Sequence, residues 1–167
     1  MTTSGILWYR RFRAAAYTSM VGLIVLTLLI VLPIHPFSYL PPIIEGGGPG
    51  LWFLLGYLIY AAVGFGGFAS LSALMFAVET YEGRRGDDTM MTAGFVLLYS
   101  GVTVTSVLLL LAGALGGYAI NVQGVTTQVA GNTLGLFVYP ITTSSLVSVI
   151  AAALLVFGMS GAKVQPR

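Results

Sequence analysis

Residues 91–120 read MTAGFVLLYSGVTVTSVLLLLAGALGGYAI, a stretch with no charged side chain and no histidine. An α-helix needs about 20 consecutive apolar residues to cross the hydrocarbon core of a bilayer. The stretch exceeds this length, so it predicts a membrane-spanning helix that tilts or extends beyond the membrane surface.

Three other stretches have the same character. They cover residues 14–32, 51–78 and 134–159, and each is long enough to span a bilayer. The first follows a basic segment, as in a signal peptide, but its apolar run is too long and no small-residue cleavage site follows. The sequence therefore predicts an all-α fold: residues 1–167 form a single domain, a polytopic membrane protein built as an antiparallel bundle of four transmembrane helices.

The composition agrees with this fold and excludes several classes of function. Hydrophobic residues make up 57% of the chain and charged residues only 7%, against about 25% charged in soluble domains. Without cysteine, neither a thiolate metal site nor a thiol nucleophile can form. Seven basic residues spread over three segments make no nucleic-acid surface, whereas contact with anionic lipid headgroups needs only a few of them.

The distribution of Lys and Arg predicts the orientation. Connections 33–50 and 121–133 contain no basic residue, and Lys and Arg concentrate on the cytoplasmic side of membrane proteins. We therefore predict a multi-pass protein of the cell (plasma) membrane with cytoplasmic N- and C-termini. The basic residues that carry this prediction are Arg10, Arg11, Arg13, Arg84, Arg85, Lys163 and Arg167.

Small and hydroxyl-bearing residues recur at four-residue spacing in spans two, three and four. Such rows let helices approach closely and bond to one another in lipid. They predict packing within one chain or, as a second interpretation, docking onto a larger neighbouring membrane subunit. The predicted packing residues are Ala62, Gly66, Ser70, Gly101, Thr105, Gly113, Gly117, Ser144 and Ser148.

The outer loop, residues 33–50, combines several prolines with a glycine run. The prolines predict that no regular helix forms there, and the apolar residues between them favour a place in the membrane interface or against a partner. Trp52, Phe53 and Tyr57 follow the loop and fit an aromatic belt at the membrane surface.

Candidates for chemistry are few, because no acid, His, Lys or Arg lies deep in a span, where proton relays and ion paths place such residues. His35, the only histidine, is in the outer loop; it is a candidate metal or haem ligand but has no second histidine or cysteine beside it. Glu79 is the acid nearest a membrane core, and we expect it to extend to the surface and pair with Arg84 or Arg85. We predict no catalytic, metal-binding or cofactor-binding residue in this chain.

Four segments carry a resemblance to a known family: GLWFLLGY (50–57), VGFGG (63–67), YSGVTVTS (99–106) and AGALGGY (112–118). Together, over about residues 49–120, they resemble the small multi-span membrane subunits that accompany archaeal haem–copper terminal oxidases. The haem- and copper-binding helices of oxidases carry histidines, and the spans here carry none. The resemblance therefore implies an accessory subunit that holds no cofactor, with haem and copper in partner subunits.

Three functions stay open on the sequence alone. The first is a non-catalytic accessory or structural subunit of a membrane respiratory complex that carries out electron transport, with other integral membrane subunits and lipids as partners. The second is a helper subunit of another membrane enzyme, such as a membrane monooxygenase. The third is a small homo-oligomeric transporter or channel, although we find no internal repeat that would support it. A stand-alone enzyme lacks candidate acid–base residues.

Overall fold

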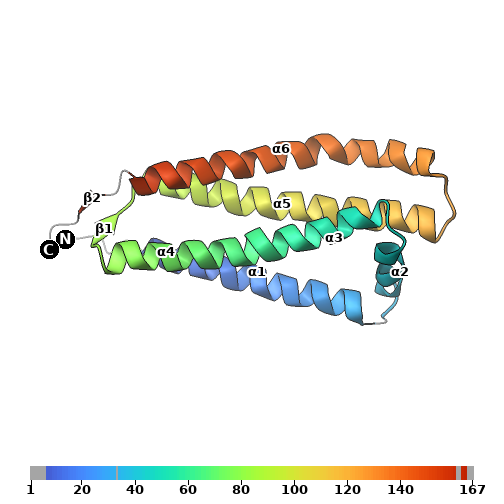
Figure 1. Cartoon of the computed structure of the whole chain (residues 1–167), viewed down its shortest axis with the longest axis horizontal. Helices are drawn as coiled ribbons and strands as arrows, with labels where there is room; N and C mark the ends of the chain where they lie inside the picture. Colours follow the sequence, from blue (N-terminus) through green and yellow to red (C-terminus); the bar gives the residue numbers. More distant parts are fainter. Residues whose placement is uncertain (1–6, 33, 161–162, 165–167) are drawn as a thin grey trace.

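The computed structural model describes residues 7–32, 34–160 and 163–164, and confirms the antiparallel bundle of four long apolar helices (Figure 1). All four are long and apolar enough to cross a membrane. The second span is continuous, although its middle widens into a π-helix, η2. In chain order the spans are α1 (Trp8–Val31), then α3 (Gly50–Ile59), η2 (Tyr60–Gly67) and α4 (Phe68–Thr80) as one run, α5 (Asp88–Asn121) and α6 (Thr127–Ser160).

The helices extend beyond the predicted apolar stretches. Helix α6 begins at Thr127 rather than at residue 134. Helix α1 begins at Trp8 rather than at residue 14 and so includes three arginines in its first turns. Hydropathy marks only the part of a helix that lies in the hydrocarbon. Long arginine side chains can leave the apolar region and reach the polar interface, so the helix continues through them.

The outer loop differs from its prediction, because part of it is helical. A 3₁₀ turn, η1 (Phe37–Tyr39), leads into a short α-helix, α2 (Leu40–Glu45). The prediction that prolines exclude a regular helix was wrong because Pro41 and Pro42 fall in the first turn of α2, where a backbone N–H has no helical partner to lose.

The central helix of the fold is α5. It packs along α6 on one side and α3 on the other, while α1 packs against η2 and α4 (Figure 1). In the most apolar part of α5, 44% of the residues are buried inside the chain, against 17% in each other span. The bundle is therefore open, and α1 and α6 each leave a large part of their surface uncovered.

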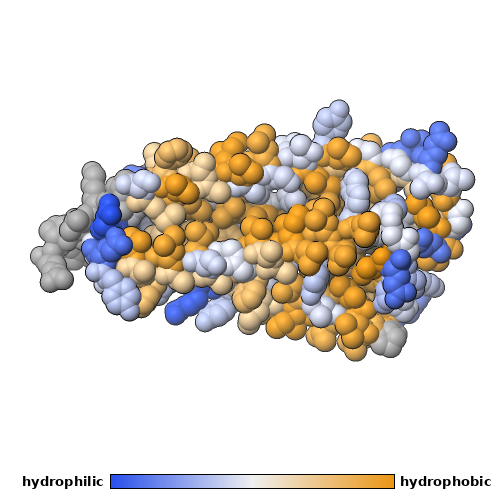
Figure 2. Space-filling model, viewed as in Figure 1, coloured by the Kyte–Doolittle hydropathy of each residue, from blue (hydrophilic) through white to orange (hydrophobic). Residues whose placement is uncertain are grey.

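The two ends of the bundle differ in composition. At one end, called the charged end below, β1 (Arg84–Arg85) pairs antiparallel with β2 (Lys163–Val164), beside the start of α1 and the end of α6 (Figure 1). Arg167 lies outside the described residues. The opposite end carries α2. In Figure 2, apolar side chains cover most of the middle of the visible face, and strongly hydrophilic ones gather mainly near the ends.

Candidate functional site

The acids at the charged end are engaged in contacts within the chain. Asp87 caps α5 by accepting hydrogen bonds from two backbone N–H groups of its first turn, at 3.1 and 2.9 Å. Glu82 lies 3.7 Å from Arg84, and Asp88 lies 3.2 Å from Arg85. These carboxylates act locally, as caps and ion pairs, rather than along a path through the membrane.

Glu79 has a different role from the predicted one. We expected an ion pair with Arg84 or Arg85, but its carboxylate oxygens accept hydrogen bonds from the backbone N–H groups of Trp8 and Tyr9, at 3.0 and 3.2 Å. The end of α4 therefore caps the beginning of α1. A carboxylate here satisfies open donors and complements the positive end of the helix dipole. The sequence does not show which helix end an acid faces, so this contact was missed.

An aromatic cluster, also missed, fills the space between α1, α4 and α5 at this end. Trp8 and Phe12 are 1% and 0% exposed. The ring of Phe12 lies 6.2 Å from that of Phe68 and 5.3 Å from that of Phe95, and Phe95 stacks on Tyr99 at 6.3 Å. Aromatic pairs at such separations stabilise a contact beyond their buried area. The cluster therefore anchors α1 to the rest of the bundle.

The contact between α5 and α6 uses four of the predicted packing residues. A side chain on Gly101 would begin 2.5 Å from the hydroxyl of Ser148, so glycine is needed for this close approach. Four residues further along α5, Thr105 donates a buried hydrogen bond of 2.8 Å to Ser144. All four residues thus lie where α5 and α6 approach each other within the chain.

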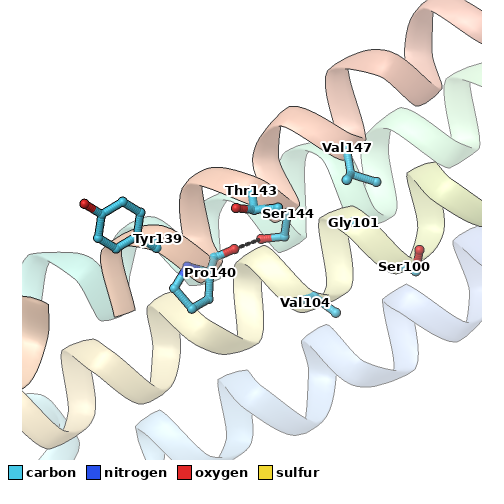
Figure 3. A pocket seen from close by; sticks show the side chains of 8 residues that line it. All are labelled: Ser100, Gly101, Val104, Tyr139, Pro140, Thr143, Ser144 and Val147. Carbon is cyan, nitrogen blue, oxygen red and sulfur yellow. Dashed lines mark hydrogen bonds between the residues drawn. The ribbon is translucent and has the colours of Figure 1, made fainter. Parts of the chain in front are cut away.

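A groove follows the same contact on one outer face. Its volume is about 560 Å³, and α5 and α6 each contribute one wall (Figure 3). Ser144, at its base, donates to the carbonyl of Pro140 at 2.9 Å, as drawn in Figure 3. The groove is mostly apolar with a few hydroxyls, and its lining residues are Ser100, Gly101, Val104, Tyr139, Pro140, Thr143, Ser144 and Val147.

A second groove, of about 350 Å³, lies between the second span, α5 and α6. It is also apolar with three hydroxyl-bearing residues. The face of α6 that does not touch α5 is thus bordered by hollows, which its own chain does not fill. The lining residues are Ile59, Val63, Leu98, Val102, Thr105, Ser145, Ser148, Val149 and Ala152.

Gly113 and Gly117 face the chain itself rather than a partner. A side chain at Gly113 would begin 2.6 Å from the Cα atom of Phe53, and one at Gly117 would overlap Ile43 of α2. Phe53 is 5% exposed, so it belongs to this contact and not to the aromatic belt predicted for it. Of the two interpretations of these glycines, the structure favours packing within one chain.

The row of Ala62, Gly66 and Ser70 lies elsewhere. Ala62 and Ser70 are exposed, and a side chain on Gly66 would meet only the carbonyl oxygen of Ala61, at 3.6 Å. This row therefore does not contribute to the main helix contacts inside the chain. It lies on the outer surface of the bundle.

His35 is exposed at the opposite end, with its ring 5.7 Å from that of Tyr39. The ring of Tyr39 in turn lies 5.6 Å from that of Tyr118 on α5. Among the described residues there is no group of three or more His, Cys, Asp or Glu side chains that could hold a metal ion. The structure thus places His35 in an aromatic contact and brings no other candidate ligand to it.

The fold and these surfaces define a multi-pass α-helical membrane protein with open grooves beside α6. Comparisons with models of protein families, with characterised proteins and with solved structures find no match.

Proposed function

We propose that this chain is a non-catalytic accessory subunit that packs, through the exposed side of α6, against another integral membrane subunit. The observation that carries the proposal is the open contact between α5 and α6. Helix α6 packs extensively only on α5 and leaves grooves of about 560 and 350 Å³ beside it. A neighbouring helix seated here would cover the side of α6 that its own chain leaves open.

The chemistry of the grooves fits a protein helix. Helices in lipid associate through shape-matched packing and through hydrogen bonds, because lipid tails are as apolar as the side chains. An unfilled hollow forfeits dispersion contacts along its walls. Side chains of a neighbouring helix can restore these contacts and reach the hydroxyls of Ser100 and Thr143, both of which are exposed.

Residues 49–120 resemble accessory subunits of haem–copper terminal oxidases, so we propose that the partner belongs to a respiratory complex of that type. In such a complex, haem and copper belong to partner subunits and this chain supports their helices. The positions of the charges agree with a structural role. The described Arg side chains lie at the charged end, as does every acid except Glu45, rather than along the middle of a span. A membrane monooxygenase is a second host that the same surfaces fit.

A bulky residue in the larger groove tests the proposal. Thr143→Trp places an indole in the groove, whereas Val25→Trp adds the same group to an exposed position on α1, away from α6. We expect Thr143→Trp to migrate as a folded, free subunit on a native gel after mild solubilisation. Val25→Trp and the unmodified chain should co-migrate with haem-bearing subunits.

Other outcomes separate the alternatives. A ladder of multiples of the chain would favour a homo-oligomeric transporter or channel. Migration of the unmodified chain as a monomer, without partners, would contradict an accessory role. Co-migration with copper-containing but haem-free subunits would assign the chain to an enzyme of another kind.

We further propose that the charged end is cytoplasmic, since it carries the described basic residues. The chain has no cysteine, so single cysteines report without background. We expect a membrane-impermeant thiol reagent to label Ser38→Cys only from outside the cell and Tyr81→Cys only from the cytoplasm. Leu146→Cys, in the middle of α6, should resist labelling from both sides. Labelling of Ser38→Cys from the cytoplasm would reverse the orientation.

A further inference from the structure

Three arginines at the start of α1 have no acidic partner in the part of the chain that the structure describes. The acids of the charged end are held by backbone N–H groups, by Arg84 and by Arg85. The arginines contact aromatic side chains instead: Arg10 bonds the hydroxyl of Tyr9, and Arg11 and Arg13 lie over aromatic rings. Positive charge is thus left over on this side of the molecule.

A groove of about 320 Å³ begins at one of these arginines and runs between α1 and α5. Its α1 wall has Arg11 at one end and Thr18 at the other, about 10 Å apart along the helix axis at 1.5 Å per residue. Phe95 and Tyr99, stacked on each other, form the α5 wall. Ala14 and Ala15 leave the space between the walls open.

Between Arg11 and the far end of the groove, the α1 wall has no hydroxyl that lacks a hydrogen-bond acceptor. The side chain of Thr18 donates to the carbonyl of Ala14 at 3.0 Å, so its hydrogen is already used. The site therefore combines one cation with a mostly apolar groove along α1, and among its lining side chains only Thr18 and Tyr99 add a hydroxyl. This is the distribution of polarity in a phospholipid with an anionic headgroup, whose phosphate sits at the membrane surface while its acyl chains run inward.

We propose that this groove binds one anionic phospholipid, with the headgroup phosphate on Arg11 and an acyl chain between Ala14 and Tyr99. A guanidinium is well suited to a phosphate, because its planar donors match the phosphate oxygens. A soluble anion would use Arg11 but would leave the apolar channel empty. The lipid site is independent of which subunits the chain contacts elsewhere.

Arg11 is held in place for this role before a lipid arrives. Its guanidinium carbon lies 4.4 Å from the centre of the Trp8 ring, and the Trp8 indole N–H donates to Asp88 at 3.0 Å. The ring is 1% exposed, so it cannot turn away without opening the aromatic cluster. A fixed guanidinium loses less conformational freedom on binding a phosphate than a mobile one.

Native mass spectrometry of the full-length chain tests the site. The protein is equilibrated in mild detergent with equal amounts of phosphatidylglycerol and phosphatidylcholine that carry identical acyl chains. We expect one phosphatidylglycerol to be retained in preference to phosphatidylcholine. Arg11→Gln should reduce this preference about fivefold, the effect of one basic residue near an anionic headgroup. Arg10→Gln removes the same charge one residue away, outside the groove, and should reduce the preference less than Arg11→Gln does.

A second pair of variants tests the channel without changing charge. Ala14→Leu fills the groove from an exposed position, whereas Val21→Leu enlarges an exposed α1 residue outside it. Ala14→Leu should lose the bound lipid and keep the unmodified chain's thermal unfolding midpoint, and Val21→Leu should retain the lipid.

Four outcomes would overturn the lipid site. They are no preference for phosphatidylglycerol in the unmodified chain, equal losses in the two arginine variants, full retention in Ala14→Leu, and displacement of the lipid by excess inorganic phosphate. Equal losses would indicate diffuse surface charge. Displacement by phosphate would indicate an anion site without an acyl chain.

Discussion

Replacing Gly113 and Gly117 together by leucine is expected to remove folded protein from the membrane, not to release an intact subunit. At Gly113 even a Cβ atom would lie 2.6 Å from the Cα atom of Phe53, and backbone cannot rotate aside as a side chain can. Overpacking costs about 1–3 kcal/mol per site, so the pair costs about 2–6 kcal/mol if the two effects add. Native stabilities are about 5–15 kcal/mol, and a loss of this size consumes much of that reserve.

The measurement is the yield of monodisperse protein in size-exclusion chromatography, compared with total inserted protein. Ala62→Leu combined with Ser70→Leu is the matched control, because it adds the same two side chains to the exposed row on the second span. We expect the control pair to stay folded. If the Gly113 and Gly117 pair stays folded and fully assembled, α3 does not approach α5 as closely as described.

The glycines of α5 and the small residues of the second span show why the fold could be predicted from the sequence and the helix contacts could not. The number of spans and their helical structure follow from the length of the apolar runs, and those predictions are confirmed. Which face is buried is a different question, because in lipid the outer faces are as apolar as the inner ones. Small residues occur on both, so the spacing of Gly113 and Gly117 looks no different in sequence from that of Ala62 and Gly66.

The contacts at the charged end escaped prediction for another reason. Trp8 precedes the apolar run and stands in a basic segment, which favours a surface position rather than a buried one. Its burial depends on α4 supplying Glu79 to the helix end and on α5 supplying Asp88 to the indole. Each of these partners is at least 70 residues away in the chain. No local pattern in the sequence indicates such a pairing.

Trp8 therefore joins three helices at one point. Its indole N–H bonds to Asp88 of α5, its backbone N–H bonds to Glu79 of α4, and its ring lies 6.4 Å from that of Phe12 on α1. Truncation would leave a cavity bounded by these helices, and the surrounding rings are held in mutual contact and can fill it only in part. The loss is therefore a transfer term plus a cavity term.

We expect Trp8→Ala to destabilise the protein by about 3–5 kcal/mol, the range for truncation of large buried aromatic residues. Trp8→Phe keeps a ring but loses the donor to Asp88, which retains Arg85 as its partner, and should cost about 1 kcal/mol. Trp52→Ala is the control, because Trp52 is only partly buried, at the edge of a groove near the opposite end. Thermal unfolding of the detergent-solubilised variants should rank Trp8→Ala well below Trp52→Ala. If the two alanine variants unfold at the same temperature, the aromatic cluster does not anchor α1, and α1 is held chiefly by its contacts with η2 and α4 further along the helix.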